Sequence, residues 1–189
     1  MLRRSRTRLA VLGALSVEPM TGYAIREAIR DVLGHFWSES FGQIYPTLAS
    51  LVDDGHLTKS PTERAGASQY TLTDSGRAAL VAFLSEPLEP TRPRDELLLR
   101  LFFGRHLGPH ACAALVTEAR DAAHQRLNSF AAIRAEIETE TGYEADRDYW
   151  KLTLSAGEHA AHAAIAWAEE TLASLEGFPT EGENRLSSS

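Results

Sequence analysis

Apolar and polar residues alternate at helical spacing over most of the chain, and one short stretch interrupts that pattern. The first amphipathic segment predicts a helix over about 6–16, which ends in the turn at 17–20. A second helix is predicted to begin after Thr21, a residue that suits an N-cap, and to run to about Leu33, where Gly34 ends it. The chain therefore opens on two consecutive helices.

A third helix is expected to begin near Ser40, because Ser40 and Gln43 have the spacing of a capping box. The pair Asp54 and Gly55 would end it. Its predicted buried stripe follows the spacing i, i+4, i+7 and i+8, namely Ile44, Leu48, Leu51 and Val52. Pro46 would lie in the early turns, so this helix either begins later or is locally distorted.

Two extended segments follow, 56–60 and 68–72, and the residues between them are rich in turn formers. This arrangement predicts a two-stranded β-hairpin. Thr73 is then expected to cap a fourth helix over about 74–85.

The second half of the sequence is helical throughout. Three prolines within seven residues predict a linker at 87–93. Helices are predicted over 94–107, 110–141 and 146–176, and the residues from 177 onward predict a flexible tail. Each of the two long helices would span roughly 45 Å at 1.5 Å per residue. Helices of that length need a partner to cover their apolar stripe.

Three helices, a hairpin and a closing helix describe a winged helix-turn-helix, whose third helix can enter a major groove about 12 Å wide. The predicted fold class is therefore mainly α, with an N-terminal winged helix-turn-helix that carries a two-stranded wing and a C-terminal all-helical dimerisation domain. The predicted domains are 1–86 for DNA binding, 87–93 for the proline-rich linker, 94–176 for dimerisation and 177–189 for the tail.

The net charge of −7 would argue against nucleic acid if it were spread evenly. Residues 1–30, however, carry six basic and two acidic groups, and residues 1–86 carry nine of each. Residues 87–189 carry ten basic and seventeen acidic groups, so the whole excess of negative charge lies in the second half. DNA therefore stays a candidate partner of the first half, and the acidic half is expected to face away from the duplex.

The cysteine content and the absence of targeting signals in the sequence indicate the cellular compartment that we expect for the protein. The single cysteine, Cys112, excludes an intrachain disulfide framework and is expected to be a small buried group rather than a redox sensor. The arginines at 3–8 and the apolar run at 9–17 resemble a signal peptide, but no small-x-small cleavage site follows. No apolar run approaches the roughly 20 residues of a membrane span. The sequence thus predicts a cytoplasmic protein without a membrane partner.

Five segments match one protein family in order and in spacing. They are LAVLGAL at 9–15, PMTGYAI at 19–25, GQIYPTLASL at 42–51, DGHL at 54–57 and YTLTDSG at 70–76. The chain resembles the PadR family of bacterial transcriptional regulators. Beyond the linker, LLLRLFF at 97–103 and the segment 152–170 resemble the C-terminal helical domain of virulence-activator-type members. The resemblance covers about residues 6–176.

This resemblance implies a homodimer that is assembled through the C-terminal helices and binds a pseudo-palindromic promoter site. Most members are repressors that a small molecule releases, and a minority are activators. Carried over by position, the DNA-reading residues of the third helix and the wing are Ser40, Gly42, Gln43, Tyr45, Pro46, Lys59 and Arg64. The wing loop has a single basic residue, so its contribution is expected to be modest.

The residues themselves add an electrostatic arm of four arginines at the start of the chain: Arg3, Arg4, Arg6 and Arg8. This arm either contacts DNA or is merely solvated. Gln43 either completes the cap with Ser40 or reads bases, and the two roles can coexist. Tyr45 either packs in the core or reaches a phosphate. Tyr23 and Tyr70 are expected to pack.

The sequence also suggests an aromatic or phenolic effector as a partner. The candidate residues for this pocket are four aromatic side chains and a histidine: Phe36, Trp37, Trp150, His159 and Trp167. The competing interpretation is that these residues form the core of a dimer.

Catalysis and metal binding find no support in the sequence. It contains no nucleophile–base pair, phosphate loop or carboxylate dyad at meaningful spacing. His159 and His162 are three residues apart, and Gly108 and Pro109 break the helix between His106 and His110. We therefore expect no enzyme, no metal and no cofactor.

The predicted function is a homodimeric DNA-binding transcriptional regulator. The alternative is a ligand-binding or protein-interaction module that uses the winged-helix fold without binding DNA. Binding of a promoter fragment separates the two.

Overall fold

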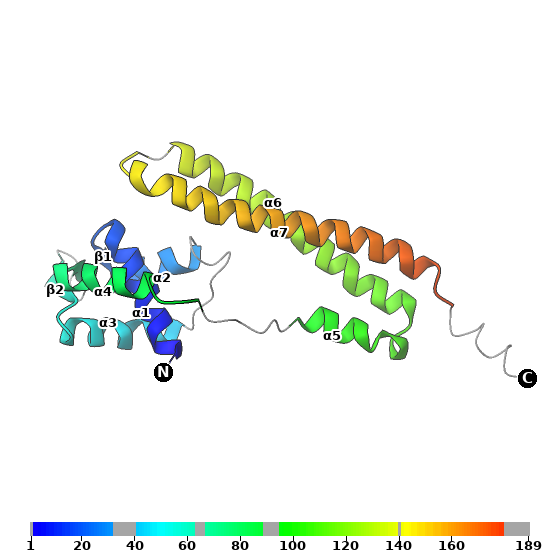
Figure 1. The fold of residues 1–189 in the computed structure, drawn as a ribbon, viewed down its shortest axis with the longest axis horizontal. Helices are drawn as coiled ribbons and strands as arrows, with labels where there is room; N and C mark the ends of the chain where they lie inside the picture. Colours follow the sequence, from blue (N-terminus) through cyan, green and yellow to red (C-terminus); the bar gives the residue numbers. More distant parts are fainter. Residues whose placement is uncertain (1, 32–40, 63–66, 89–94, 140, 180–189) are drawn as a thin grey trace, which may run out of the picture. The chain divides into compact units, whose positions relative to one another are not determined.

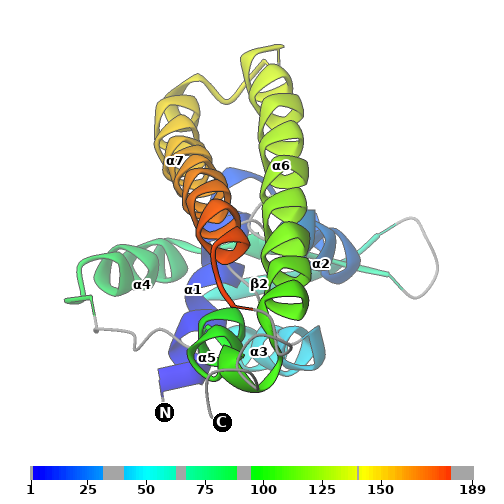
Figure 2. The same cartoon turned by 90° about the vertical axis from the view of Figure 1, so that its right-hand side faces the viewer.

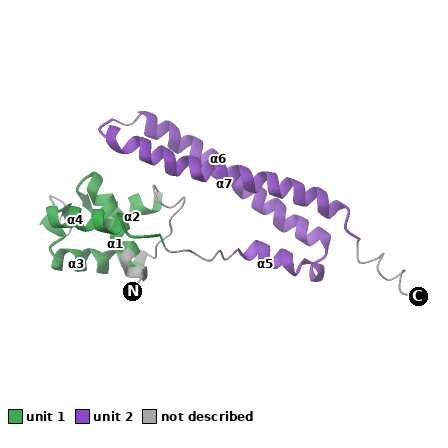
Figure 3. Cartoon of the chain, in the orientation of Figure 1, with its two compact units in different colours: residues 1–90 green, residues 91–189 purple. Residues whose placement is uncertain are grey.

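A computed structural model describes residues 2–31, 41–62, 67–88, 95–139 and 141–179, with the backbone alone at 2–5, 31 and 41. The chain divides into two compact units, residues 1–90 and 91–189 (Figures 1 and 3). The finer domain boundaries expected from the sequence stay a prediction. The fold class is as predicted, a winged helix-turn-helix followed by long helices.

The first unit begins with α1 (Leu2–Val17), which starts earlier than expected. Arg3 and Arg4, which were predicted to precede this helix, lie within it, so that part of the prediction is wrong. The physical reason is that leucine and arginine favour helix and that no glycine or proline precedes Gly13. The C-terminal half of α1 buries Val11, Leu12 and Leu15 in the core.

The second helix, α2 (Gly22–Asp31), begins where the sequence predicted. Thr21 Oγ1 accepts a hydrogen bond of 3.2 Å from the amide of Ala24, which confirms Thr21 as the cap. Ile25 and Ile29 face the core. The predicted end of this helix at Leu33 lies outside the described residues.

The sheet has three strands where two were predicted. It consists of β1 (Met20–Thr21), β2 (Leu57–Pro61) and β3 (Ser68–Leu72), all antiparallel, in the order β1-β3-β2. The predicted hairpin is confirmed as β2 and β3, which pair Leu57 with Leu72 at one end. The additional strand β1 pairs Met20 with Tyr70. Sequence reasoning missed it because two residues show no alternation.

The helix α4 (Asp74–Leu84) closes the first unit, and Thr73 caps it as predicted. Thr73 Oγ1 accepts a hydrogen bond of 3.0 Å from the amide of Gly76. The same hydroxyl donates a hydrogen that is shared between two carbonyl oxygens, that of Gly55 at 2.8 Å and that of His56 at 3.0 Å. The start of α4 is thereby attached to the turn that leads into the wing.

The second unit contains α5 (Glu96–Phe102), a 3₁₀ turn (Gly104–His106), α6 (Pro109–Thr139) and α7 (Glu144–Glu176). The apolar helix expected over 94–107 is thus shorter than predicted. The two long helices are confirmed, and they form an antiparallel hairpin (Figure 2). Gly108 and Gly142, the predicted breaks, adopt φ of +80° and +94°. Among the described helices, none is both long and apolar enough to cross a membrane.

The hairpin of α6 and α7 is packed around Phe130, whose ring lies against Gly157. Leu154 and Ala161 complete this buried cluster. Nearby, Arg134 donates from Nε and Nη2 to the two carboxylate oxygens of Glu158, at 3.0 and 2.6 Å. Cys112 is buried against Gly104 of the 3₁₀ turn, as the sequence predicted for a small apolar group.

The ion pair between α6 and α7 makes the stability of the hairpin depend on pH. The guanidinium of Arg134 lowers the pKa of Glu158 below its usual value. A depressed pKa contributes stability above the unfolded-state pKa, and that contribution is lost as the pH falls through the folded-state pKa. We expect Glu158→Gln to be less stable than wild type at neutral pH and equal to it in acid, as measured by thermal unfolding across pH. A constant difference at all pH values would contradict this.

Candidate nucleic-acid interface

The helix α3 (Ile44–Asp53) follows a short 3₁₀ turn (Phe41–Gln43). Because α3 begins at Ile44, Pro46 is its third residue, a position whose amide needs no partner within the helix. The helix thus begins later than Ser40, which is the first of the two alternatives that the sequence left open for Pro46. Gln43 occupies the N-cap position without a side-chain hydrogen bond to the helix, and the predicted capping box with Ser40 stays a prediction. Ser40 lies outside the described residues.

The two faces of α3 differ sharply in exposure. Four of its residues are buried, Ile44, Thr47, Leu48 and Leu51. The candidate reading residues all lie on the exposed side: Gly42, Gln43, Tyr45 and Pro46. Tyr45 is 54% exposed, which excludes the interpretation of this ring as a core residue. The start of α3 thus presents a continuous polar and aromatic face to solvent.

The start of α2 extends this surface. A Cβ on Gly22 would lie 2.8 Å from Cε1 of Tyr45, so the tyrosine ring rests directly on that glycine. The next residue, Tyr23, is 62% exposed, and the guanidinium carbon of Arg26 lies 5.6 Å from its ring centre. The expectation that Tyr23 packs in the core is wrong, whereas Tyr70 is buried as predicted.

Sequence reasoning therefore missed the exposure of Tyr23 and its contact with Arg26. The helical spacing did contain a signal for the exposure of Tyr23. The core positions of α2 are Ile25 and Ile29, and a residue that precedes Ile25 by two positions lies on another side of the helix.

The end of α3 leads directly into the wing. Gly55 adopts φ of +75°, its amide donates to the Val52 carbonyl at 3.0 Å, and the amide of His56 donates to the Leu51 carbonyl at 2.9 Å. These two bonds form a Schellman cap, which confirms the predicted end of the helix. Lys59 is exposed on β2. Arg64 lies outside the described residues.

The side chains of two of the four arginines of α1 are described, and they differ in their surroundings. Arg3 and Arg4 belong to the first turns of the helix, and their side chains lie outside the described part. Arg6 is partly buried. Arg8 is bonded within the protein, since its Nη2 lies 2.7 Å from Oδ2 of Asp54. The guanidinium of Arg8 is the main reason why the pKa of Asp54 lies below its usual value.

Three of the predicted effector residues, Trp150, His159 and Trp167, lie on α7. Trp150 contacts Tyr143, with ring centres 5.6 Å apart. His159 is exposed, and its Nδ1 lies 2.8 Å from the carbonyl oxygen of Ser155, while Trp167 is 37% exposed. Phe36 and Trp37 lie outside the described residues.

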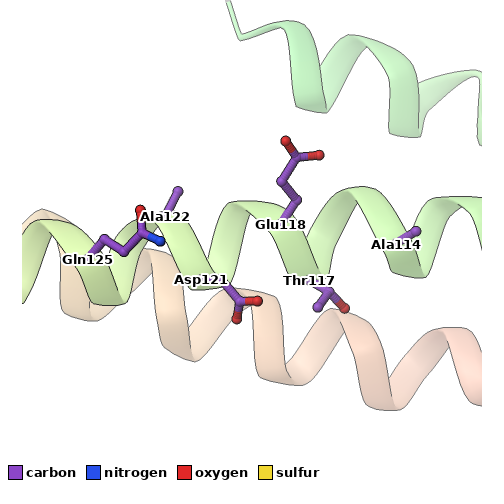
Figure 4. A pocket seen from close by; sticks show the side chains of 6 residues that line it. All are labelled: Ala114, Thr117, Glu118, Asp121, Ala122 and Gln125. Atoms are coloured by element: carbon purple, nitrogen blue, oxygen red, sulfur yellow. The ribbon is translucent and has the colours of Figure 1, made fainter.

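An open depression of the second unit lies on α6 (Figure 4). Its six lining residues include two acids and no aromatic ring: Ala114, Thr117, Glu118, Asp121, Ala122 and Gln125. None of them belongs to the predicted effector set. Among the residues that the structure describes, no three histidines, cysteines or carboxylates gather closely enough to hold a metal ion.

Two family models match the chain, and together they span both units. Residues 11–82 match the transcriptional regulator PadR-like family, and residues 93–176 match the virulence activator alpha C-terminal domain. The chain belongs to the PadR-like family of transcriptional regulators. We call residues 11–82 the PadR-like domain and residues 93–176 the virulence-activator domain.

Relatives and solved structures agree with this assignment. The negative transcriptional regulator PadR of Bacillus subtilis is 37% identical over 99 residues, which is 50% of this chain and 54% of that protein. A probable transcriptional regulator of Mycobacterium tuberculosis is 27% identical over 88% of this chain and 96% of its own length.

The structure of B. subtilis PadR in complex with operator DNA matches with a TM-score of 0.77 at 27% identity, over 89% of this chain and 98% of that one. The structure of the same regulator in complex with p-coumaric acid matches with a TM-score of 0.73 over the same shares.

Proposed function

We propose that this PadR-like regulator is a homodimeric repressor that binds a pseudo-palindromic promoter site and is released by a small aromatic effector. The observation that carries the proposal is the face at the start of α3, where Gln43 and Tyr45 are exposed above a fully buried stripe. DNA binding by B. subtilis PadR, a relative with the same fold, supports it.

The proposed reading surface is centred on the start of α3. A helix whose inner side is fixed in a core can place its outer N-terminal residues against base edges in the major groove. Gln43 can read an adenine edge through its amide, and the hydroxyl of Tyr45 can reach a phosphate. We include Tyr23 and Arg26 because they continue this surface at the start of α2.

Charged groups are proposed to hold the DNA backbone on either side of α3. They are Lys59 and Arg64 of the wing and Arg3, Arg4 and Arg6 of α1. Two uncharged residues close to the start of α3, Ser40 and Gly42, complete the proposed contacts. Residues 1–86 have no net charge, so nonspecific binding should be weak and base contacts should carry much of the affinity. A regulator of this kind acts where the chromosome lies, which places it in the cytoplasm.

The second copy is proposed to cover apolar surface of the virulence-activator domain. Several large apolar side chains on α5 and the turn after it are at least half exposed: Leu98, Leu99, Phe102 and Phe103. On α7, Leu152 and Trp167 are also exposed. Exposed apolar side chains of this size gather at interfaces. A dimer would place two reading helices about one turn of DNA apart, roughly 34 Å.

The proposed effector is an aromatic acid or phenol. B. subtilis PadR binds p-coumaric acid, and this chain keeps exposed Trp167 and partly buried Trp150 in the virulence-activator domain. A ligand that binds more tightly to dimers with one spacing of the DNA-binding units raises the fraction of dimers with that spacing. No chemical reaction is required. Release then follows when the preferred spacing no longer fits the operator.

Binding to DNA selected from a random library tests the proposed function. We expect the wild type to enrich a palindromic duplex, and Gln43→Ala to weaken binding to it by about 1–3 kcal/mol. Gln125→Ala makes the same chemical change in α6 of the second unit and should leave binding unchanged. Sedimentation of the free protein tests the dimer.

Two results would contradict the proposal. A wild type that enriches no duplex leaves the protein-interaction module as the better explanation. A Gln43→Ala variant that binds as tightly as wild type removes α3 from the reading surface.

A further inference from the structure

A charged bridge joins α1 to the end of α3. Nη2 of Arg8 lies 2.7 Å from Oδ2 of Asp54, and Nη1 of Arg8 donates to Oγ of Ser50 at 3.1 Å. Ser50 in turn lies 3.5 Å from the Asp54 carboxylate. Because Ser50 and Asp54 are four residues apart, both face the same side of the last turn of α3, and one guanidinium holds them together.

The bridge has an electrostatic reason. Asp54 directly follows α3, where the unpaired carbonyl groups give the helix end a partial negative charge that disfavours a carboxylate. Asp53 adds a second acid at the same end, and it is exposed. The groups whose proximity lowers the pKa of Asp54 are first Arg8, by a hydrogen bond and by its charge, and then His56 and Ser50. Arg8 therefore offsets an otherwise unfavourable charge at the junction between α3 and the wing.

We propose that Arg8 is a positioning residue for α3 and not a contact to DNA phosphates. Its side chain is 20% exposed, against 46% for Asp54, and its charge is already met by a carboxylate. It holds the C-terminal end of α3, about 15 Å from Gln43 at the other end of this ten-residue helix. Holding that end against α1 sets the direction in which Gln43 and Tyr45 point. This inference deepens the proposed function and rests on it.

Neutralising Asp54 separates the two roles, because they predict opposite signs. If Arg8 were a phosphate contact, Asp54→Asn would free its guanidinium and remove a negative charge, and both changes would tighten binding to DNA. If Arg8 positions α3, Asp54→Asn breaks the bridge and weakens binding. Asp53→Asn is the matched control, since it removes the same charge one residue earlier.

The test measures binding of the duplex selected by the wild type, by fluorescence anisotropy at several salt concentrations. We expect Arg8→Met and Asp54→Asn each to weaken binding by about two- to fivefold, the effect of an exposed ion pair. The double variant should be no weaker than either single variant, because both remove one interaction. The slope of log affinity against log salt should stay that of wild type.

Three results would overturn the inference. The first is tighter binding by Asp54→Asn, and the second is additive weakening in the double variant. The third is a salt slope in Arg8→Met that is shallower by about 0.9, the change expected when the protein neutralises one phosphate fewer. Thermal unfolding of each variant shows whether weaker binding comes from loss of the folded protein and not from loss of the bridge.

Hydrogen exchange of the free protein distinguishes this inference from the proposed function. We expect Arg8→Met and Asp54→Asn to speed exchange at the amides of 54–56, whether or not any DNA is bound. If the wild type selects no duplex, the proposed function fails, and exchange still reports whether the bridge holds the end of α3. Unchanged exchange in both variants would also overturn the positioning role.

Discussion

Gly76→Ala should destabilise the PadR-like domain by about 3 kcal/mol, the upper part of the range for an overpacked site. A Cβ at this position would lie 2.1 Å from the carbonyl oxygen of His56 and 2.8 Å from Cδ1 of Leu72. The carbonyl cannot move aside easily, because His56 also accepts the amide of Thr73 at 3.1 Å. The loss should appear although alanine is the better helix former by about 1 kcal/mol.

Urea unfolding with hydrogen exchange read at 57–72 measures this effect in the first unit. Gly13→Ala is the matched control, since a Cβ there meets nothing within 4 Å, and it should be neutral or stabilising. Equal stability of the two variants would mean that the start of α4 can shift away from the wing at little cost. That result would also contradict the rigid junction between α3, the wing and α4.

Phe130→Ala should destabilise the hairpin of α6 and α7 by about 3–5 kcal/mol, the usual range for a buried phenylalanine. Phe130 is 3% exposed, and its ring occupies the space that the absent side chain of Gly157 leaves open. Removing the ring would create a cavity bounded by two helix backbones that cannot easily close it. If the hairpin carries the dimer interface, the variant should also dissociate at higher protein concentration than wild type.

Thermal unfolding and sedimentation velocity measure the two consequences. Ser129→Ala is the control in the same turn of α6, because Ser129 is exposed and its hydroxyl donates to the carbonyl of Gln125 in its own helix. A loss below about 1 kcal/mol in Phe130→Ala would show that the hairpin repacks around the gap. A stable hairpin with a weakened dimer would instead place Phe130 at the interface.

Helix order, the wing hairpin and the helix ends were predictable because each rests on local chemistry. Thr21 and Thr73 cap as expected, and Gly55 ends α3 with the positive φ that glycine favours. The burial of Tyr70 was also predicted. These features depend on a few neighbouring residues, so the sequence contains the information that defines them.

Several of the errors concern contacts between segments that are far apart in the sequence. The pairing of β1 with β3 joins residues about 50 positions apart, and two residues carry no periodic signal. The bridge from Arg8 to Asp54 spans a similar distance, so a pattern of basic residues read alone suggested a free arm. The ring of Tyr45 lies against Gly22, a contact between two helices more than 20 residues apart, and Tyr23 beside that glycine is exposed.

The order of the strands has a consequence for association. Because β3 lies in the middle of the sheet, β2 is an outer strand, and no described strand pairs with its other side. An open strand edge invites pairing with other chains, and aggregation often begins there. The strand β2 ends in Pro61, which has no amide hydrogen to donate, and carries the charged Lys59. The residue proposed to hold DNA thus also helps to keep neighbouring molecules from adding a strand to this sheet.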